Sequence, residues 1–315
     1  MANHHHLSAA PEHVVWGYFD AARLPVLSVD SGDTVTVDAL TGAEWNEIPE
    51  DRSRVLPEHM AILEHAPRGP GPHLVTGPVE VRGARAGDVL QVDILDVSLR
   101  QDWGYCVVKP LMGTLPDEFP DRELAIIDID MAAKTARLPW GIDLPLAPFF
   151  GIMAVAPPRA WGRVTTVIPR AFGGNMDNKA LGAGTTLYLP VFNDGALFLA
   201  GDGHGVQGDG EVCLTALETA LSGTFRLTVR RDLDLKHPFA ETATHLITIG
   251  LDEDLDDAAK QAVSEMVRAV CARSNLSRTQ AYMLCSLAAD LKVTQTVDVH
   301  KGAHMVLAKS TFSGA

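Results

Sequence analysis

The sequence predicts a mainly β protein: a β-sandwich-like core with a C-terminal α+β portion. Two patterns carry this prediction. Over the first two thirds of the chain, apolar residues alternate with polar ones between frequent Gly, Pro and Asp turns, which is typical of a sandwich or barrel. Near the C-terminus the apolar spacing changes to three and four residues, which indicates helices. We therefore divide the chain into a β-rich region, 1–240, which holds the candidate site, and an α+β portion, 241–315.

Short strands are predicted wherever apolar residues alternate after a turn. The turn Asn193–Gly195 is expected to close a hairpin between Tyr188–Phe192 and Ala196–Ala200, because Asn, Asp and Gly tolerate the dihedral angles of hairpin turns. The alternating apolar positions are Val35 and Val37; Leu90, Val92 and Ile94; Leu187, Leu189 and Val191; and Phe225, Leu227 and Val229.

The last seventy or so residues mix strands and helices. Leu246–Leu251 is predicted as a strand, and the apolar positions from Ala258 to Val270 predict an amphipathic helix. Ser277–Gln280 has the pattern of a capping box, so we expect a second helix from there to about Asp290. His304–Ala308 is predicted as a closing strand.

Composition and charge limit the partners of the chain. Of its 315 residues, 46% are hydrophobic and 21% are charged, which is enough apolar content for a globular core. The formal net charge of −14 repels phosphate backbones and anionic membrane surfaces, so neither nucleic acid nor membrane is an expected partner. A neutral or cationic small molecule fits better, although the same charge also serves solubility.

Targeting and redox signals are weak. No signal-like apolar run begins the chain, and none approaches the roughly 18 residues of a membrane span, so we expect a cytoplasmic protein. The histidines at 4–6 are expected to be mobile because they lie at the extreme terminus. None of the four cysteines forms a C-x-x-C pair, which favours free, buried thiols. They are Cys106, Cys213, Cys271 and Cys285.

The densest group of reactive side chains lies in the glycine-rich stretch Gly201–Glu211, which we expect to be a loop held by apolar strands. Either His204 and a neighbouring aspartate bind a divalent metal, or a carboxylate such as Glu211 activates water without one. A purely hydrogen-bonded or calcium-type turn is the alternative. The polar residues of this stretch are Asp202, His204, Gln207, Asp209 and Glu211.

A second group follows two glycines whose backbone N–H groups are suited to stabilising an oxyanion. In it, Asn175 is placed to donate to a carbonyl, and Asp177 to hold a metal or orient a water. His73 is a further candidate ligand, although a lone histidine is more often structural. The G-x-G-x-x-G at 203–208 is not read as a dinucleotide site, because no strand–helix–strand context surrounds it.

Together these segments resemble the acetamidase/formamidase family, from about Ser31 to Lys309. The order and spacing of the motifs make the resemblance specific, and Leu56–Pro72 departs from the usual pattern. The motifs are Thr76-Gly77-Pro78 with Val79–Asp88, Gly173-Gly174-Asn175-Met176-Asp177, Leu189-Pro190-Val191, Gly195-Ala196, Gly201–His204, Gln207–Glu211 and Val293–Asp298.

The resemblance implies hydrolysis of a small linear amide to ammonia and a short carboxylate. It also implies a homodimer or higher oligomer and a bound divalent ion, zinc or calcium. The family's functional residues fall here on Asn175, Asp177, Asp202, His204, Gln207, Asp209 and Glu211.

The resulting hypothesis separates metal ligands from catalytic groups. Metal ligands are expected among Asp177, Asp202, His204 and His73, and catalytic groups among Asn175, Gln207, Asp209 and Glu211. Water attacks the amide directly, because no supported nucleophile accompanies these groups. Two alternatives stay open: the same fold acting on a larger or cyclic amide, and a metal-stabilised sandwich that binds a ligand without catalysis.

Overall fold

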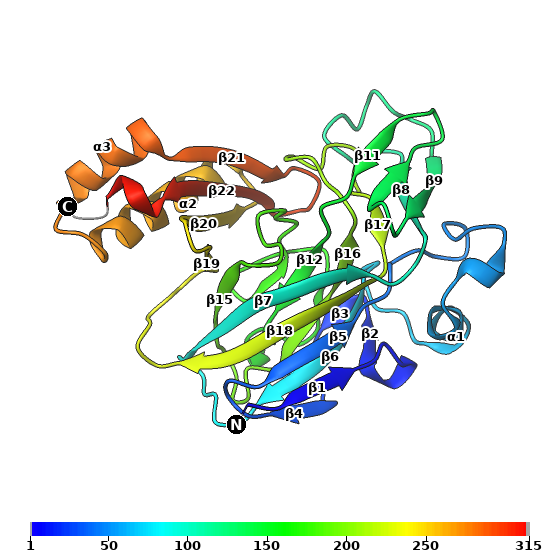
Figure 1. Ribbon diagram of the computed structural model, residues 1–315, viewed down its shortest axis with the longest axis horizontal. Helices are drawn as coiled ribbons and strands as arrows, with labels where there is room; N and C mark the ends of the chain where they lie inside the picture. Colours follow the sequence, from blue (N-terminus) through cyan, green and yellow to red (C-terminus); the bar gives the residue numbers. More distant parts are fainter. Residues whose placement is uncertain (1, 313–315) are drawn as a thin grey trace.

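The computed structural model describes residues 2–312 and contains two large β-sheets (Figure 1). The first has nine strands, and its order shows that strands from both ends of the chain share one sheet. In spatial order these are β1 (His4–Leu7), β5 (Thr34–Asp38), β18 (Leu221–Arg230), β7 (Val89–Leu99), β15 (Thr186–Pro190), β19 (Phe239–Glu241), β20 (His245–Asp252), β22 (Lys301–Ala308) and β21 (Asp290–Gln295).

The second sheet has eleven strands, three of which branch from the main path: β6 (Leu74–Val81) pairs with β16, β2 (Val14–Trp16) and β4 (Leu27–Val29). A two-stranded sheet, β3 (Tyr18–Phe19) with β13 (Val164–Thr165), accompanies it. The main path is β11 (Asp143–Pro145), β10 (Thr135–Arg137), β9 (Glu123–Asp130), β8 (Trp103–Val108), β17 (Glu218–Thr219), β16 (Phe198–His204), β12 (Phe149–Ala154) and β14 (Gly173–Asn175).

The main hydrophobic core lies between these sheets and takes side chains from both. Phe225 on β18 contacts Phe150 on β12 and Phe198 on β16, with ring centroids 5.3 and 5.5 Å apart. Fully burying each such side chain contributes about 1.5–3 kcal/mol. The predicted β-sandwich-like core is therefore confirmed, and the alternating residues point inward as expected, although Val229 is only partly buried.

The C-terminal part adds two helices to the end of the nine-stranded sheet. Helix α2 (Leu255–Cys271) and helix α3 (Arg278–Ala288) pack over β20 and β22 around a second core. The capping box at Ser277 and Gln280 is present. The second helix ends two residues earlier than predicted, because Ala289 is extended and Asp290 already begins β21. The division at residue 240 stays a prediction, and the nine-stranded sheet continues across it.

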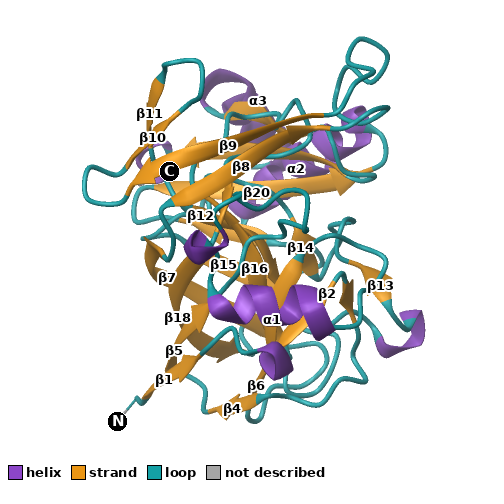
Figure 2. Ribbon diagram, turned by 90° about the vertical axis from the view of Figure 1, so that its right-hand side faces the viewer, coloured by secondary structure: helices purple, strands orange, loops and turns teal. Residues whose placement is uncertain are grey.

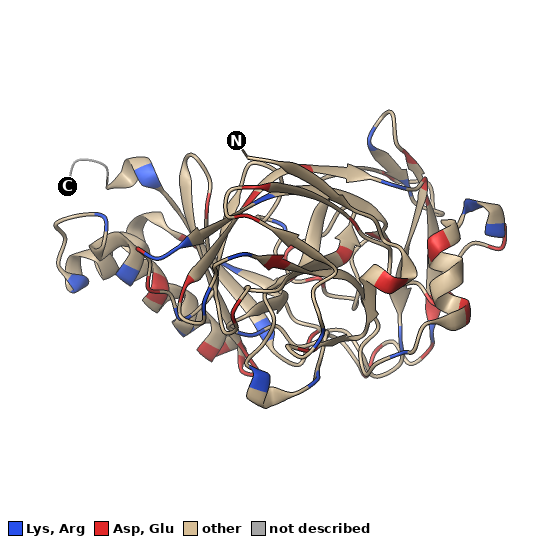
Figure 3. Ribbon diagram, turned by 90° about the horizontal axis from the view of Figure 1, so that it is seen from below, with Lys and Arg blue, Asp and Glu red and all other residues tan. Residues whose placement is uncertain are grey.

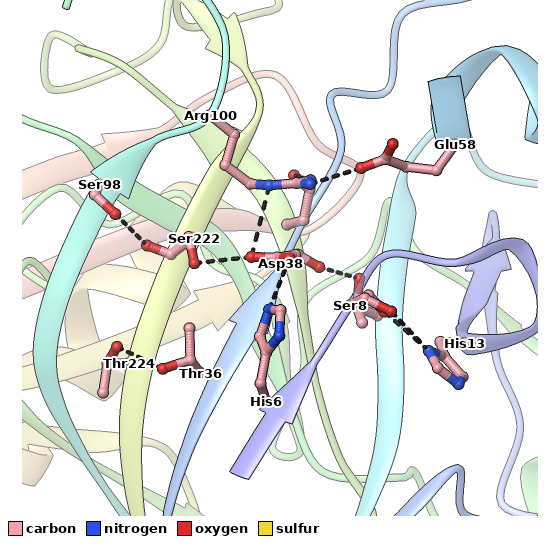
Figure 4. Close-up of polar contacts among 12 residues, drawn as sticks. His6, Ser8, His13, Thr36, Asp38, Glu58, Ser98, Arg100, Ser222 and Thr224 are labelled. Carbon is pink, nitrogen blue, oxygen red and sulfur yellow. Dashed lines mark hydrogen bonds and ion pairs between the residues drawn. The ribbon is translucent and has the colours of Figure 1, made fainter. Parts of the chain in front are cut away.

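Three local predictions were wrong. The turn at Asn193–Gly195 does not close a hairpin: Ala196 and Leu197 adopt φ of 58° and 61°, and the chain passes from β15 in one sheet to β16 in the other. Gly201–His204 is the end of β16 and not loop. The histidines at 4–6 form β1, which pairs with β5, and His6 contacts Asp38 at 2.9 Å (Figure 4).

Helix α1 (Pro57–His65) lies far from α2 and α3, which pack together at the other end of the molecule (Figures 1 and 2). Figure 3 shows Lys and Arg scattered among Asp and Glu over the ribbon. Within residues 2–312, no helix combines the length and apolar character needed to cross a membrane.

Candidate active site

Strand β12 brings the two predicted groups of polar residues together. It pairs on one side with β14, where Ile152 faces Asn175, and on the other with β16, where Phe149 faces His204. The backbone N–H groups of Met176 and Asp177 both donate to the carbonyl of Gly151. The segments around Asn175 and His204 are thus fixed on either side of one strand by the sheet itself.

Gly151 permits this close approach. A Cβ atom there would lie 2.4 Å from Asp177 Oδ1, 2.5 Å from Asp202 Oδ2 and 2.9 Å from His204 Cε1. Such distances are closer than van der Waals contact allows, so any larger residue would push the side chains apart. The glycine therefore sets how tightly the group can converge.

His204 is the centre of the site and is 1% exposed. Its Nε2 lies 3.2 Å from Asp202 Oδ2, 3.3 Å from Glu218 Oε1 and 3.8 Å from Asp177 Oδ1. Its ring meets Phe149 edge-on, with centroids 5.0 Å apart.

Gln207 fixes the proton on the other ring nitrogen. The Gln207 Nε2 donates to the Asp177 carbonyl at 2.7 Å, so its Oε1 faces His204 Nδ1 at 2.9 Å. An amide oxygen only accepts, and Nδ1 must therefore carry the hydrogen. In neutral His204 the lone pair would then sit on Nε2, directed at carboxylate oxygens. That arrangement is stable only if Nε2 is protonated or a cation lies between the groups.

Further carboxyl groups face the same cavity, which has a volume of about 110 Å³. Asn175 Nδ2 donates to Asp298 Oδ2 at 2.9 Å. Three buried oxygens, Asn175 Oδ1, Asp177 Oδ1 and Glu211 Oε2, have no hydrogen-bond partner among the described residues. Because an unpaired buried polar atom costs about 1–3 kcal/mol, these oxygens point to a bound group that would satisfy them.

Burial and mutual repulsion perturb the carboxyl groups strongly. Burial, with the neighbouring Asp298, raises the pKa of Asp177 well above its usual range. Burial and the neighbouring Asp177 raise the pKa of Glu211 well above its usual range. Burial and the neighbouring Glu211 raise the pKa of Asp298 in the same way. Burial raises the pKa of Glu218 to about 7. The protein alone therefore does not hold all of these groups ionised at neutral pH.

The imidazoles respond in opposite directions. Burial opposes a charge on His204, but Glu218 and Asp202 outweigh it and hold its pKa well above the usual range. Burial lowers the pKa of His73, which lines the cavity and bonds Thr166 Oγ1 through Nδ1 at 2.9 Å. Burial also opposes a charge on Asp202, yet the two histidines bring its pKa below the usual value.

The backbone is strained where the site carboxylates leave it. Asp177, Asp202 and Glu211 have φ of 45°, 56° and 45°, in the left-handed region that non-glycine residues rarely adopt. Such strain is typical of functional sites, where surrounding structure enforces it.

The donor set fits a divalent cation. Two groups of ligand atoms share His204, and within each the atoms lie within 4.8 Å of one another. One group is Asp177, His204 and Glu211, and the other is Asp202, His204 and Glu218. A cation in either group would lie against the Nε2 lone pair of His204. The side chains here are therefore able to bind a metal.

Not every predicted site residue reaches this cavity. His73, Asn175, Asp177, Asp202, His204 and Glu211 line it, and Gln207 supports His204 from behind. Asp209 does not: its side chain is 32% exposed and pairs with Lys179 at 3.1 Å. Gly210 at φ 100° and Glu211 at φ 45° turn the chain after Asp209. The side chains of Asp209 and Glu211 therefore point in different directions.

Three carboxylates of the cavity were missed as functional candidates: Glu47, Glu218 and Asp298. Asp298 belonged to a family motif but received no role. Glu218 lies in the apolar run Ala216–Leu221, and its charge within that run was the available signal, since an unpaired acidic residue is seldom buried.

Comparison with known proteins decides the family. The model of the acetamidase/formamidase family matches residues 25–165 and 160–312. The chain belongs to this family. The crystal structure of an acetamidase from Bacillus halodurans is 32% identical in sequence and superposes with a TM-score of 0.83, covering 98% of this chain and 100% of that one.

Two curated relatives of the acetamidase/formamidase family agree over shorter stretches. An acetamidase of Mycolicibacterium smegmatis is 28% identical over 198 residues, which is 44% of this chain and 49% of the relative. A formamidase of Methylophilus methylotrophus is 30% identical over 197 residues, 44% of this chain and 47% of the relative. The matches thus span about half the length of each of these two relatives.

Proposed function

We propose that the chain hydrolyses a small linear amide, such as formamide or acetamide, to ammonia and a carboxylate. Its family membership supports the reaction class. The size of the cavity supports a small substrate: about 110 Å³ is well below the roughly 300–1,000 Å³ of pockets for larger ligands. The observation that carries the proposal is the buried His204 Nε2 facing three carboxylates across this small space.

Asp202, His204 and Glu218 would hold a divalent ion, with His73 beside Asp202. The imidazole donor favours zinc over calcium, which prefers oxygen ligands alone. When bound, such an ion polarises the amide carbonyl and acidifies the attacking water. Gln207 keeps the proton on Nδ1 of His204 and so leaves Nε2 available as a ligand atom.

Glu211 is the proposed proton carrier. Its buried, electronegative surroundings make the ionised carboxylate a strong proton acceptor. It takes a proton from water as the oxygen attacks the carbonyl carbon, and returns it to the nitrogen as the C–N bond breaks and ammonia leaves. Asn175 has a second Nδ2 hydrogen to donate to the oxyanion. Neither Ser nor Cys is found among the described residues lining the cavity, which supports direct attack by water.

An ammonia-release screen over short, long and cyclic amides tests the proposal. We expect release from formamide or acetamide, and a loss of about 100-fold or more in Glu211→Gln, the range for a lost general base. Asp209→Asn is the matched control. Release only from long or cyclic amides would favour the alternative substrate, and trapping of a hydroxamate by hydroxylamine would contradict direct hydrolysis.

A chain that releases ammonia from none of these amides, yet binds one and loses that affinity in His204→Ala, would be a ligand-binding protein instead. A homodimer and a cytoplasmic location stay predictions alongside this proposal.

A further inference from the structure

A pair of thiols lies directly behind the active-site loop. Cys106 on β8 and Cys213 in the segment after Glu211 place their Sγ atoms 3.4 Å apart. Both thiols are half-buried and free, and both contact the carbonyl oxygen of Thr215, at 3.8 and 3.7 Å. They line a second cavity of about 300 Å³ that also reaches Gln207 and Glu211. The neighbouring Tyr105 lines the first cavity, and Glu211 and Thr215 line both, so the thiols adjoin the candidate active site.

We propose that Cys106 and Cys213 are a reversible oxidation site whose disulfide displaces Glu211. Hydrogen peroxide is the oxidant. One thiol attacks the peroxide oxygen, the O–O bond breaks, and a sulfenic acid and water form. The second thiol then attacks that sulfur and releases a second water, so that two thiols and hydrogen peroxide give one disulfide and two waters. The second cavity provides the space that the oxidant needs.

The chain on either side of Glu211 explains how the disulfide would reach the site. Gly210 is held firmly, because its N–H donates to Thr294 O at 2.9 Å and its carbonyl accepts from Thr296 N at 3.0 Å. Disulfide sulfurs lie about 2.0 Å apart, so the Sγ atoms would approach by about 1.4 Å. With Gly210 fixed, that movement falls on the three residues 211–213, where Glu211 is already strained at φ 45°.

The other two cysteines provide an internal contrast. Cys271 and Cys285 lie on α2 and α3, in the core of the C-terminal part. Oxidation there would leave the loop that carries Glu211 unchanged.

The test treats the purified full chain with hydrogen peroxide and measures free thiols, peptide cross-links by mass spectrometry, and ammonia release. We expect two of the four thiols to disappear, a Cys106–Cys213 cross-linked peptide, and a loss of activity of about tenfold or more, since a 1 Å misplacement can have larger effects. A thiol reductant restores the activity. The Cys106→Ser and Cys213→Ala variants keep the activity of the reduced wild-type protein and lose its sensitivity to peroxide. The Cys271→Ser variant stays sensitive to peroxide.

Absence of the cross-link in the wild-type protein would overturn the proposal, and so would a cross-link that leaves activity unchanged. The activity part rests on the proposed function, but the cross-link does not. A chain that forms the disulfide and hydrolyses no amide would therefore refute the proposed function and leave the oxidation site standing.

Discussion

Two clusters of histidines and carboxylates lie in the same molecule and differ in charge balance. Around Asp38 on β5, each charge has a partner: His6 contacts one oxygen at 2.9 Å, Ser222 donates to the other, and Arg100 joins Asp38 to Glu58 (Figure 4). Around His204, six carboxyl groups line a small buried cavity, and two of their oxygens have no partner among the described residues. The first network is complete, whereas the second leaves buried oxygens unpaired and brings carboxyl groups close to one another.

This difference separates a structural network from a functional one. The Asp38 network joins β1 to β5 and α1, and its charged groups are paired with one another without a ligand. In the His204 cluster, the pairing of β12 with β14 and β16 holds the carboxyl groups close together despite their repulsion, the backbone strain and the unpaired oxygens. Such an arrangement costs stability unless a cation or substrate binds, which is the physical sign of a site.

Removing His204 should cause the largest loss of amide hydrolysis among the changes compared. We expect His204→Ala to lower amide hydrolysis by about 100-fold or more, because the proposed metal ligand at the centre of the cluster is lost. His6→Ala, the matched change in the balanced network, should alter it by less than about twofold, as expected for an exposed pair. Steady-state ammonia release measures both, and equal effects of the two changes would remove the distinction.

Widening the cluster by one methyl group should have the next largest effect. Gly151→Ala places a Cβ against Asp177 and Asp202, so we expect a loss of about tenfold or more in kcat/KM. Gly182→Ala is the control, because a Cβ there meets nothing within 4 Å. If the Gly151 variant kept full activity, convergence of these carboxylates would not be required.

Glu218 of the His204 cluster and Asp33, which pairs with His5 of β1, should give opposite dependences of stability on pH. In the metal-free protein, burial raises the Glu218 pKa to about 7 from 4.5, so the folded state favours the protonated carboxyl group. The stabilisation of the fold by this protonation is complete below pH about 4.5 and is lost as pH rises toward 7. The backbone N–H of Asn3 and the His5 side chain lower the Asp33 pKa to about 2 from 3.8, so that stabilisation is lost as pH falls from about 4 to 2.

Chemical unfolding of chelator-treated protein at several pH values measures these slopes. Glu218→Gln should flatten the slope between pH 4.5 and 7, and Asp33→Asn should flatten only the acid limb. A Glu218 variant with an unchanged neutral slope would contradict the assigned pKa.

The smallest effect is expected at Asp209. Its partly exposed pair with Lys179 contributes at most about 1 kcal/mol, so Asp209→Asn should change activity by less than about threefold. A loss as large as that of Glu211→Gln would mean that Asp209, and not Glu211, carries the proton.

Much of the fold could be predicted from local pattern. The alternation of apolar and polar residues predicted the strands, and the three- and four-residue apolar spacing predicted α2. Both patterns are local, because they reflect which face of one element is buried. Strand partners were harder. The turn at Asn193–Gly195 has hairpin chemistry, but the positive φ values at Ala196 and Leu197 send the chain to the other sheet. Those angles depend on tertiary contacts that no local pattern contains.

The candidate site was predictable where its residues stand beside glycines. Asn175 and Asp177, and likewise Asp202 and His204, lie in segments whose composition is unusual for strands. Glu218 comes from a two-residue strand within an apolar run, and only sheet pairing brings it opposite His204. Long-range pairing therefore supplied what local composition could not.

The proposed mechanism depends on cation binding by the His204 cluster. Its most direct test is the divalent metal content of the purified protein, measured by inductively coupled plasma mass spectrometry after dialysis. We predict close to one ion per chain in the wild-type protein and almost none in the Asp202→Asn, Glu218→Gln double variant. Wild-type protein that remains metal-free after incubation with zinc, while still hydrolysing amides at full rate, would contradict the account.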